Sequence, residues 1–248
     1  MSINRRQFLG LSGTAFAATA LAPGLRLIEL AQARSPDEAA TSLHRWGLLI
    51  DASKCADGCT SCVDACHVEN GVTSHNRPAT DAQWIRKVTL KDKQTGHVQT
   101  LPLMCLHCEH PPCVDVCPTG ASFKRADGIV LVDKHICIGC RYCMMACPYD
   151  QRFFYAAERA YFQEGPTPFE QAGYRRHQEG VVSKCNFCLP RLEKGLDPAC
   201  VANCMARART FGDLDDPNNE VSKLICNRGG YQLYPELGTN PSIYYLPP

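Results

Sequence analysis

Residues 137–148 read C-I-G-C-R-Y-C-M-M-A-C-P, so that four cysteines fall within a short run that ends in a proline. The first three cysteines are separated by two residues each and can hold one inorganic cluster from a single loop. The fourth, Cys147, follows after three more residues, so we expect its thiol to point toward a neighbouring site. Pro148 then fixes φ where the chain turns.

Other cysteine chemistries fit this stretch poorly. Zinc sites use two separated C-x-x-C knuckles rather than four cysteines in one run. Disulfides would have to join close neighbours, which conflicts with the Cα separation that a disulfide requires. The pattern C-x-x-C-x-x-C-x-x-x-C-P is that of bacterial ferredoxins, whose fourth cysteine binds the other [4Fe–4S] cluster of a pair. The stretch therefore predicts iron–sulfur ligation.

Three further quartets accompany this one, so that sixteen of the 17 cysteines belong to a quartet and Cys226 is left over. In the first quartet an extra residue separates the first two cysteines, and Gly58 could absorb it. The fourth quartet alone also suits zinc, but beside the other three we expect it to bind iron–sulfur. The three quartets are Cys55, Cys59, Cys62 and Cys66; Cys105, Cys108, Cys113 and Cys117; and Cys185, Cys188, Cys200 and Cys204.

An internal repeat groups the quartets. Residues 110–117 read H-P-P-C-V-D-V-C and are echoed by D-P-A-C-V-A-N-C at residues 197–204, each after a C-x-x-C. The second and fourth quartets are therefore one kind of unit, and the first and third are the other. This predicts four [4Fe–4S] clusters in an α+β, loop-rich fold of two interleaved bacterial-ferredoxin-like modules.

Composition supports a folded protein without a nucleic-acid partner. The chain has 248 residues with 26 Lys and Arg against 25 Asp and Glu, and 45% of its residues are hydrophobic. Such a balance excludes disorder as the main state and does not favour nucleic-acid binding. The sequence has no phosphate-cradling glycine motif, nucleophile elbow or spaced carboxylate pair, so we expect a non-catalytic protein.

The first 33 residues are typical of a twin-arginine export signal. N-R-R-Q-F-L at residues 4–9 precedes an apolar stretch over residues 8–22, and A-Q-A at residues 31–33 is a cleavage site. The alternative is a retained membrane anchor, but the apolar stretch is shorter than the ~20 residues of a membrane span. We therefore expect a periplasmic protein, exported folded with its cofactors, with no transmembrane helix after signal removal.

The segments between the quartets predict short elements and a domain order. Strands are expected at 46–50, 128–132 and 180–182, and a hairpin over 84–91 and 97–103. A helix is expected to open at Asp216-Pro217 and to run to about Cys226, and the tail from Tyr231 is expected to wrap the surface. The expected domains are 34–103 with the first quartet and hairpin, 104–156 as the central two-cluster module, 157–212 with linker and fourth quartet, and 213–248.

These motifs together resemble one family. Four quartets in this order, with H-V-E-N at 67–70, P-P-C-V-D-V-C-P-T-G-A at 111–121 and F-G-D-L-D-D-P at 211–217, are similar to the four-cluster electron-transfer subunits of respiratory oxidoreductases. Within the family, the export signal and the ending Y-Q-L-Y-P-E-L-G-T-N-P-S-I-Y-Y-L most resemble the periplasmic iron–sulfur subunit of the Dsr membrane complex of dissimilatory sulfur metabolism. Subunits of tetrathionate, polysulfide and nitrite reductases are similar too.

The resemblance implies how the cysteines share the clusters. The first cluster takes Cys55, Cys59, Cys62 and Cys204; the second takes Cys185, Cys188, Cys200 and Cys66; the third takes Cys105, Cys108, Cys113 and Cys147; and the fourth takes Cys137, Cys140, Cys143 and Cys117. The sequence departs from the family in Met205, which stands where proline is usual, and in the longer Cys55–Cys59 spacing.

The resemblance also implies the partners. It implies attachment to an integral membrane subunit that interacts with quinone, with a multihaem cytochrome c subunit as a further partner. The competing functions are a free periplasmic ferredoxin and a catalytic oxidoreductase in its own right.

Several polar residues near the quartets are candidates for tuning the clusters. Cations beside the quartets could stabilise the more negative reduced state, or they could form an ordinary solvated face. They are Lys54, Lys134, Arg141, Lys184 and Arg191. His67, His107 and His110 are expected to be hydrogen-bond donors or ordinary loop residues rather than ligands, because the cysteine sets are already complete.

Overall fold

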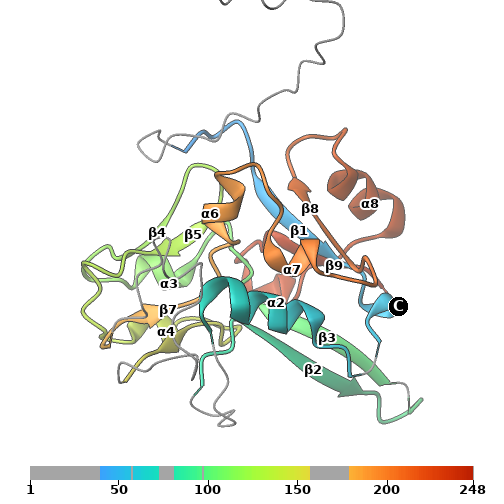
Figure 1. Ribbon diagram of the computed structural model, residues 1–248, viewed down its shortest axis with the longest axis horizontal. Helices are drawn as coiled ribbons and strands as arrows, with labels where there is room; N and C mark the ends of the chain where they lie inside the picture. The colour runs from blue at the N-terminus through green and yellow to red at the C-terminus, as the bar shows by residue number, and fades with distance from the viewer. Residues whose placement is uncertain (1–39, 57, 73–80, 97, 157–178, 248) are drawn as a thin grey trace, which may run out of the picture. The chain divides into compact units, whose positions relative to one another are not determined.

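The computed structural model describes residues 40–56, 58–72, 81–96, 98–156 and 179–247. The export signal expected at residues 1–33 and much of the expected linker after residue 156 lie outside this part of the chain. Short elements alternate with cysteine-bearing loops (Figure 1). The strands are β1 (Trp46–Ile50), β2 (Ile85–Lys91), β3 (Val98–Met104), β4 (Ser122–Lys124), β5 (Val130–Val132), β6 (Phe153–Phe154), β7 (Val182–Ser183), β8 (Arg209–Asp213) and β9 (Ile243–Tyr245).

The helices are mostly single turns that carry cysteines or follow them. The two longer ones are α2 (Ser61–Asn70) and α8 (Glu220–Arg228). The short ones are α3 (Pro112–Asp115), α4 (Tyr142–Met145), α6 (Leu189–Leu192) and α7 (Ala199–Ala202), with 3₁₀ turns η1 (Ala52–Lys54) and η2 (Pro235–Leu237). Among the described residues, no helix has the length and apolar character needed to cross a membrane.

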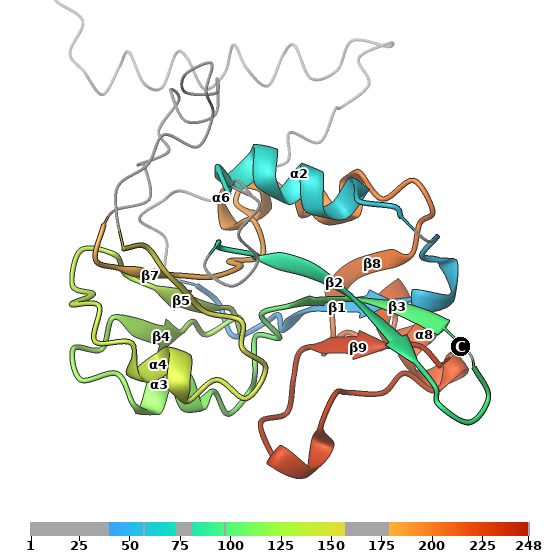
Figure 2. The same ribbon diagram turned by 90° about the horizontal axis from the view of Figure 1, so that it is seen from below.

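A three-stranded sheet joins the two ends of the described chain. β1 lies in the middle, antiparallel to β8 and parallel to β9 (Figure 2). Its sequence WGLLI is apolar throughout, and its last four residues are buried because both faces are covered: Leu48 and Ile50 lie in the main core, and Leu49 packs with Val221 and Leu246. The sheet therefore fastens the segment before the first quartet to the segment after the fourth.

The tail contradicts one expectation. Residues after Tyr231 do not only wrap the surface, because Ile243–Tyr245 forms β9. The side chains of Ile243 and Tyr245 are fully buried, and the Tyr245 hydroxyl donates a hydrogen bond to the carbonyl of Pro102 at 3.0 Å. A short apolar run in an aromatic, proline-rich tail became a strand because the edge of β1 was available to pair with it.

The hairpin expected near residues 84–103 is present. β2 and β3 are antiparallel, with Ile85 opposite Met104 and Lys91 opposite Val98. β2 begins one residue later than expected, and β3 ends one residue later. Its buried end contributes Ile85, Leu101 and Met104 to the core. The strands expected at 128–132 and 180–182 are shorter, and they pair as β4–β5 and β6–β7.

The last helix starts later than expected. Asn219 caps α8 by accepting a hydrogen bond from the Val221 amide at 3.2 Å. Asp216 instead accepts from the Asn218 amide at 2.8 Å and forms the turn before the helix. An aspartate that bonds to the backbone two residues on stabilises a turn rather than a helix start. The helix ends at Gly229, whose φ of 66° closes it in the left-handed conformation.

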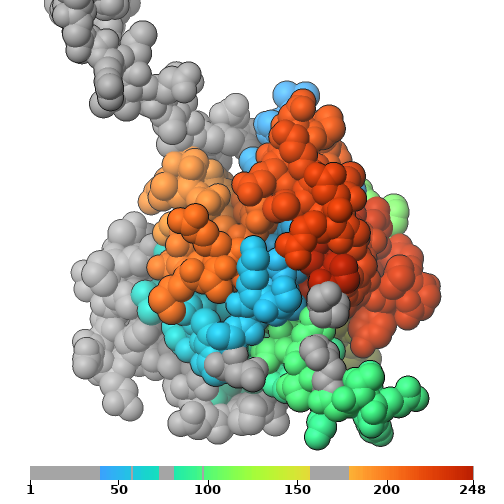
Figure 3. Space-filling model, turned by 90° about the vertical axis from the view of Figure 1, so that its right-hand side faces the viewer, coloured from blue at the N-terminus to red at the C-terminus, as the bar shows by residue number. Residues whose placement is uncertain are grey.

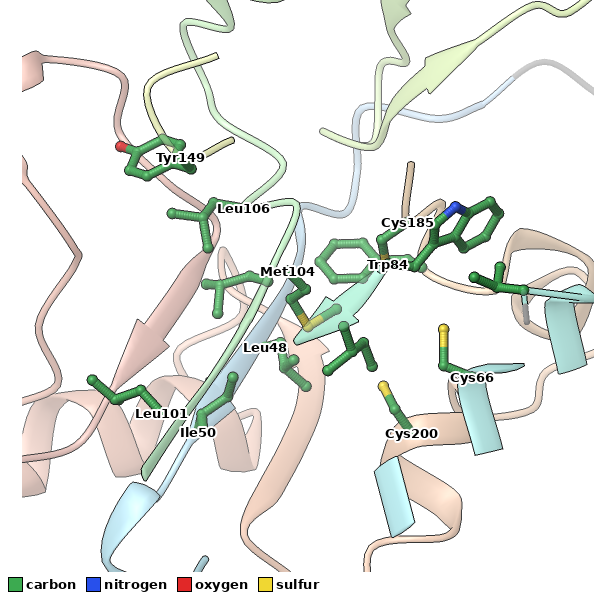
Figure 4. Packing of buried hydrophobic residues seen from close by; sticks show 14 of the residues in the cluster. Leu48, Ile50, Cys66, Trp84, Leu101, Met104, Leu106, Tyr149, Cys185 and Cys200 are labelled. Atoms are coloured by element: carbon green, nitrogen blue, oxygen red, sulfur yellow. The ribbon is translucent and has the colours of Figure 1, made fainter. Parts of the chain in front are cut away.

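Cysteines form part of the main hydrophobic core (Figure 4). Cys66, Cys185 and Cys200 are buried in the same cluster as Trp84 and Met104. A free thiol behaves as a small apolar group, but this many at one place leaves a core whose packing depends on what the sulfurs hold. The architecture is a loop-rich α+β fold.

Candidate metal centres

All four quartet loops share one backbone feature. The residue directly before the second cysteine has a positive φ in each loop: 74° at Gly58, 45° at His107, 66° at Gly139 and 55° at Phe187. A tight loop that turns its N–H groups and thiols inward requires this left-handed conformation, which glycine adopts without strain. The longer first quartet keeps the feature at Gly58.

The third cysteine of every quartet lies on a helix, and the fourth lies one turn later. Cys62 is on α2, Cys113 on α3, Cys143 on α4 and Cys200 on α7. After three of these helices, the fourth cysteine donates its backbone N–H to the carbonyl three residues earlier, at 3.0–3.3 Å. The turn carries the fourth thiol away from the first three.

The structure brings Cys66 to the fourth quartet. Burial raises the pKa of the Cys66 thiol well above its usual value, and the thiolates of Cys185, Cys188 and Cys200 raise it further. Figure 4 shows Cys66, Cys185 and Cys200 on one side of the core. The Asn70 amide nitrogen lies 3.7 Å from the Sγ of Cys66 and 3.6 Å from that of Cys188. Asn70 thus bridges sulfurs from two distant quartets.

Cys147 approaches the second quartet in the same way. Burial raises the pKa of Cys108 to about 12, and the thiolates of Cys105, Cys113 and Cys147 add to this effect. The Cys108 sulfur also hydrogen-bonds with Thr239 of the C-terminal tail, whose hydroxyl forms a hydrogen bond with the Tyr149 hydroxyl at 2.5 Å.

The other two sets lie nearer the surface. Burial raises the pKa of Cys55, an effect that Cys62 and Cys204 reinforce and Arg209 opposes. The segment that follows β1 and the segment around α7 both face the viewer in Figure 3. A separate small cavity is lined by four cysteines of the second and third quartets: Cys117, Cys137, Cys140 and Cys143.

Two residues depart from the family pattern at the first set. Met205 follows Cys204 and is 83% exposed. The Sγ of Cys59 lies 3.5 Å from the Ser61 hydroxyl, and hydrogen bonds from Ser61 lower the pKa of this thiol. Cys59 is thus the member of its set with a hydroxyl partner on α2.

The candidate histidines occupy different environments. His107 is fully buried, its Nδ1 accepts a hydrogen bond from the Val130 amide at 3.1 Å, and its ring stacks on that of Phe187. Burial lowers the pKa of both His107 and His67. His110 is exposed. The burial and stacking of His107 fit a hydrogen-bonding and packing role.

Most of the cations expected near the quartets have other partners. Arg191 pairs with Glu69 at 3.2 Å, and Arg141 lies over the Phe154 ring with its guanidinium carbon 4.3 Å from the centroid. Lys184 is buried and donates to the carbonyls of Val130 and Cys185. Lys54 lies 3.6 Å from Asp51, and Lys134 lines a cavity with Trp84.

The cations that touch cysteine sulfur are not among those expected from the sequence. Arg152 Nη2 lies 2.9 Å from the Sγ of Cys113, and Arg209 Nη1 lies 3.5 Å from the Sγ of Cys200. Each arginine comes five residues after the last cysteine of a quartet, Cys147 and Cys204. This shared spacing could have identified them, whereas closeness in sequence favoured the lysines directly beside cysteines.

The donor chemistry fits iron–sulfur clusters. All 17 cysteines carry free thiols, and soft thiolates are the ligands that such clusters use. Among the described residues, no three His, Cys, Asp or Glu side chains converge as they would around a single ion. In a [4Fe–4S] cluster each thiolate binds a different iron.

Comparisons with known proteins agree with this chemistry. Two family models described as a 4Fe-4S dicluster domain match the chain, one over residues 54–121 and the other over residues 96–164 and 160–214. An Hdr-like menaquinol oxidoreductase iron-sulfur subunit 1 from Archaeoglobus fulgidus is 38% identical, over 98% of this chain and 97% of the relative.

Two other relatives are named for enzymes of sulfur compounds. A tetrathionate reductase subunit from Salmonella typhimurium is 37% identical over 99% of this chain and 89% of its own length. A sulfite dehydrogenase subunit from Allochromatium vinosum is 40% identical over 83% of this chain and 84% of its own length.

The match places the chain among proteins that bind several [4Fe–4S] clusters. It belongs to the 4Fe-4S dicluster family of iron–sulfur subunits of respiratory oxidoreductases, and it is an electron-transfer subunit rather than a catalytic one.

Proposed function

We propose that this chain relays single electrons through four [4Fe–4S] clusters. The observation that carries the proposal is that the fourth cysteine of each quartet lies beside cysteines of another quartet: all of the first three in three of the sets, and Cys55 and Cys62 beside Cys204 in the first. The sets are Cys55, Cys59, Cys62 and Cys204; Cys66, Cys185, Cys188 and Cys200; Cys105, Cys108, Cys113 and Cys147; and Cys117, Cys137, Cys140 and Cys143. A bound [4Fe–4S] cluster supplies one-electron chemistry at a potential set by charge, hydrogen bonds and burial.

The burial of the cysteines supports an ordered relay with two ends. All four cysteines of the second set are buried, and two of the third set are. The first set has no fully buried member, and Cys140 of the fourth set is exposed. Electrons would enter or leave at the two partly exposed sets and cross the buried ones.

Neighbouring sets are close enough for their thiolates to interact. The Cys62 thiolate raises the pKa of Cys200, after the larger effects of burial and Arg209, which links the first set to the second. The pKa of Cys185 is raised by burial, by Cys188 and then by Cys105 of the third set. Burial lowers the pKa of Arg152, and the thiolates of both Cys113 and Cys143 raise it, which links the third set to the fourth. These links favour the order first, second, third, fourth.

The same sets define two modules that interleave along the chain. The first and second sets take their cysteines from the first and fourth quartets, and the third and fourth sets take theirs from the quartets between. The pairing of β1 with β8 supports this arrangement, since it brings the segment before Cys55 beside the segment after Cys204.

We propose that the chain works in a membrane-bound complex of dissimilatory sulfur metabolism, as the periplasmic iron–sulfur subunit of the Dsr complex does. The relatives named for tetrathionate and sulfite support a sulfur compound, and the relative named for menaquinol supports a quinone-linked membrane subunit as partner. A multihaem cytochrome c is the second proposed partner. The N-R-R-Q-F-L motif at 4–9 supports export of the folded protein to the periplasm.

Iron content tests the number of clusters. Protein purified without oxygen is expected to contain about 16 iron atoms per chain, four for each of four sites. Twelve iron atoms with one zinc would overturn the assignment of the fourth quartet.

Isolation from native membranes tests the complex. A tagged chain extracted in mild detergent is expected to retain a multi-span subunit that restores reduction of its clusters by a menaquinol analogue. Recovery of the holoprotein as a soluble monomer from the periplasmic fraction would instead support a free ferredoxin.

A further inference from the structure

Two arginines are buried without a carboxylate partner. Arg152 is 1% exposed and Arg209 is 5% exposed. Within the described residues neither guanidinium forms an ion pair with Asp or Glu, and each leaves a buried N–H unpaired: Nε of Arg152 and Nη2 of Arg209. A buried charge is costly unless an opposite charge and hydrogen bonds compensate for it. Something anionic must therefore stand beside each arginine.

Arg152 lies between two cysteine sets. Its Nη1 donates to the Ser122 hydroxyl at 2.6 Å, and its Nη2 donates to the Sγ of Cys113 in the third set at 2.9 Å. Ser122 also lines the cavity that Cys117, Cys137, Cys140 and Cys143 share. Cys143 belongs to the fourth set, so one side chain faces two cluster sites.

Arg209 occupies the matching place in the other module. Its Nη1 lies 3.5 Å from the Sγ of Cys200 in the second set. Arg209 also lines a cavity together with Cys204, which belongs to the first set. Thus Arg209 also faces two cluster sites.

The two positions are equivalent in sequence and in structure. Arg152 and Arg209 each stand five residues after the last cysteine of the later quartet in their module. Arg209 begins β8, and Arg152 directly precedes β6. This equivalence indicates that the two buried arginines have the same role in the two modules.

We infer that Arg152 and Arg209 are shared counter-charges, one per module, that raise the reduction potentials of the two clusters beside each arginine. The inference rests on the proposed ligand sets. When one electron passes between clusters of a module, the donor core changes from 1+ to 2+ and the acceptor core from 2+ to 1+, and no bond breaks. Arginine suits this role because it cannot release a proton. Its planar fork can also donate toward two sites at once.

The test compares potentials cluster by cluster. The EPR signals of the four clusters are first assigned with one Cys→Ser substitution in each set. Anaerobic redox titration then follows Arg152→Gln, Arg209→Gln and their lysine counterparts in the holoprotein. Arg207→Gln is the matched control, because Arg207 is exposed and lies two residues from Arg209.

Each Gln variant is expected to lower the equilibrium constant for one-electron reduction at least tenfold at the clusters of its own module. This change corresponds to a fall in reduction potential of about 59 mV. The lysine variants keep the charge and are expected to shift less. Arg207→Gln is expected to shift nothing, because water screens an exposed charge. Equal shifts at all four clusters, or unchanged potentials in a fully loaded Gln variant, would overturn the inference.

A second test uses the unmodified protein and therefore does not depend on whether the variants fold. With ¹⁵N-labelled arginine, pulsed EPR of the reduced clusters in both modules is expected to detect weakly coupled ¹⁵N. No coupling would overturn the inference even if iron analysis gave four clusters. Iron content far below about 16 in the unmodified protein would instead contradict the proposed function.

Discussion

The rings of His107 and Phe187 stack face to face, with centroids 3.8 Å apart and planes inclined by 14°. Each residue directly precedes the second cysteine of its quartet, and each has a positive φ. A ring-bearing residue in this conformation is strained, whereas the equivalent residues in the first and third quartets are glycines. The stack packs the second-quartet loop against the fourth-quartet loop.

The stack leads to a prediction about stability. His107→Phe keeps a ring but removes the Nδ1 acceptor of the buried Val130 amide, which should cost about 1–3 kcal/mol. The temperature at which cluster absorbance is lost without oxygen should therefore fall. His110→Phe is the control, since His110 is exposed, and an equal effect of both changes would contradict the stated role of His107.

The crossed ligand sets lead to a second prediction. Cys66→Ala should damage the cluster held by Cys185, Cys188 and Cys200, leaving a three-iron cluster visible by EPR in the oxidised state. Combining Cys66→Ala with Cys188→Ala should affect one cluster, because both residues serve the same site. Combining it with Cys59→Ala should affect two clusters. The opposite pattern would mean that each quartet closes on its own cluster.

Gly139 is expected to tolerate no side chain. A Cβ at this position would lie 2.1 Å from the carbonyl oxygen of Gly180, which is backbone and cannot swing away. Gly139→Ala should therefore displace the third-quartet loop and lower iron content by about four atoms, one cluster. Gly58→Ala is the matched control, with a φ of 74° and nothing within 4 Å of its added Cβ. Full iron in Gly139→Ala would show that the loop can shift without losing ligands.

Cys226 is expected to be dispensable. Its side chain is exposed on α8, outside every set. Cys226→Ser should leave both iron content and the EPR spectrum of the reduced protein unchanged. Loss of one cluster would show that a ligand has been misassigned.

Removal of the clusters should unfold the core. Cys66, Cys185 and Cys200 lie in the main hydrophobic cluster, and Arg152 and Arg209 would lose the anions that compensate their burial. Chelation of iron without oxygen should abolish the near-UV circular dichroism and expose the chain to protease, and iron with sulfide should restore both. A protease-resistant apoprotein would show that hydrophobic packing alone maintains the fold.

The sequence alone was enough to predict the elements whose information is local. The spacing of Cys137, Cys140 and Cys143 is set by the reach of one loop around one cluster, and Cys147 follows at the offset typical of bacterial ferredoxins. The cofactor could therefore be predicted from a dozen residues. The same holds for β1, which could be predicted from its own apolar run without reference to the strands beside it, and for the hairpin of β2 and β3. The start of α8 was misplaced because Asp216 and Asn219 are both good caps, and only the turn between them decides which is used.

The tertiary structure decided what depends on distant partners. β9 exists because β1 offers it an edge, and no periodicity in a tail of Tyr and Pro residues signals that edge. His107 and Phe187 became a stacked pair only when two cysteine loops packed together. The cations that contact sulfur are Arg152 and Arg209 rather than the lysines adjacent to cysteines, because a buried cation is placed by the fold around it. Ligand identity is a property of spacing along the chain, whereas the electrostatic environment of a cluster is a property of the space that the folded chain encloses.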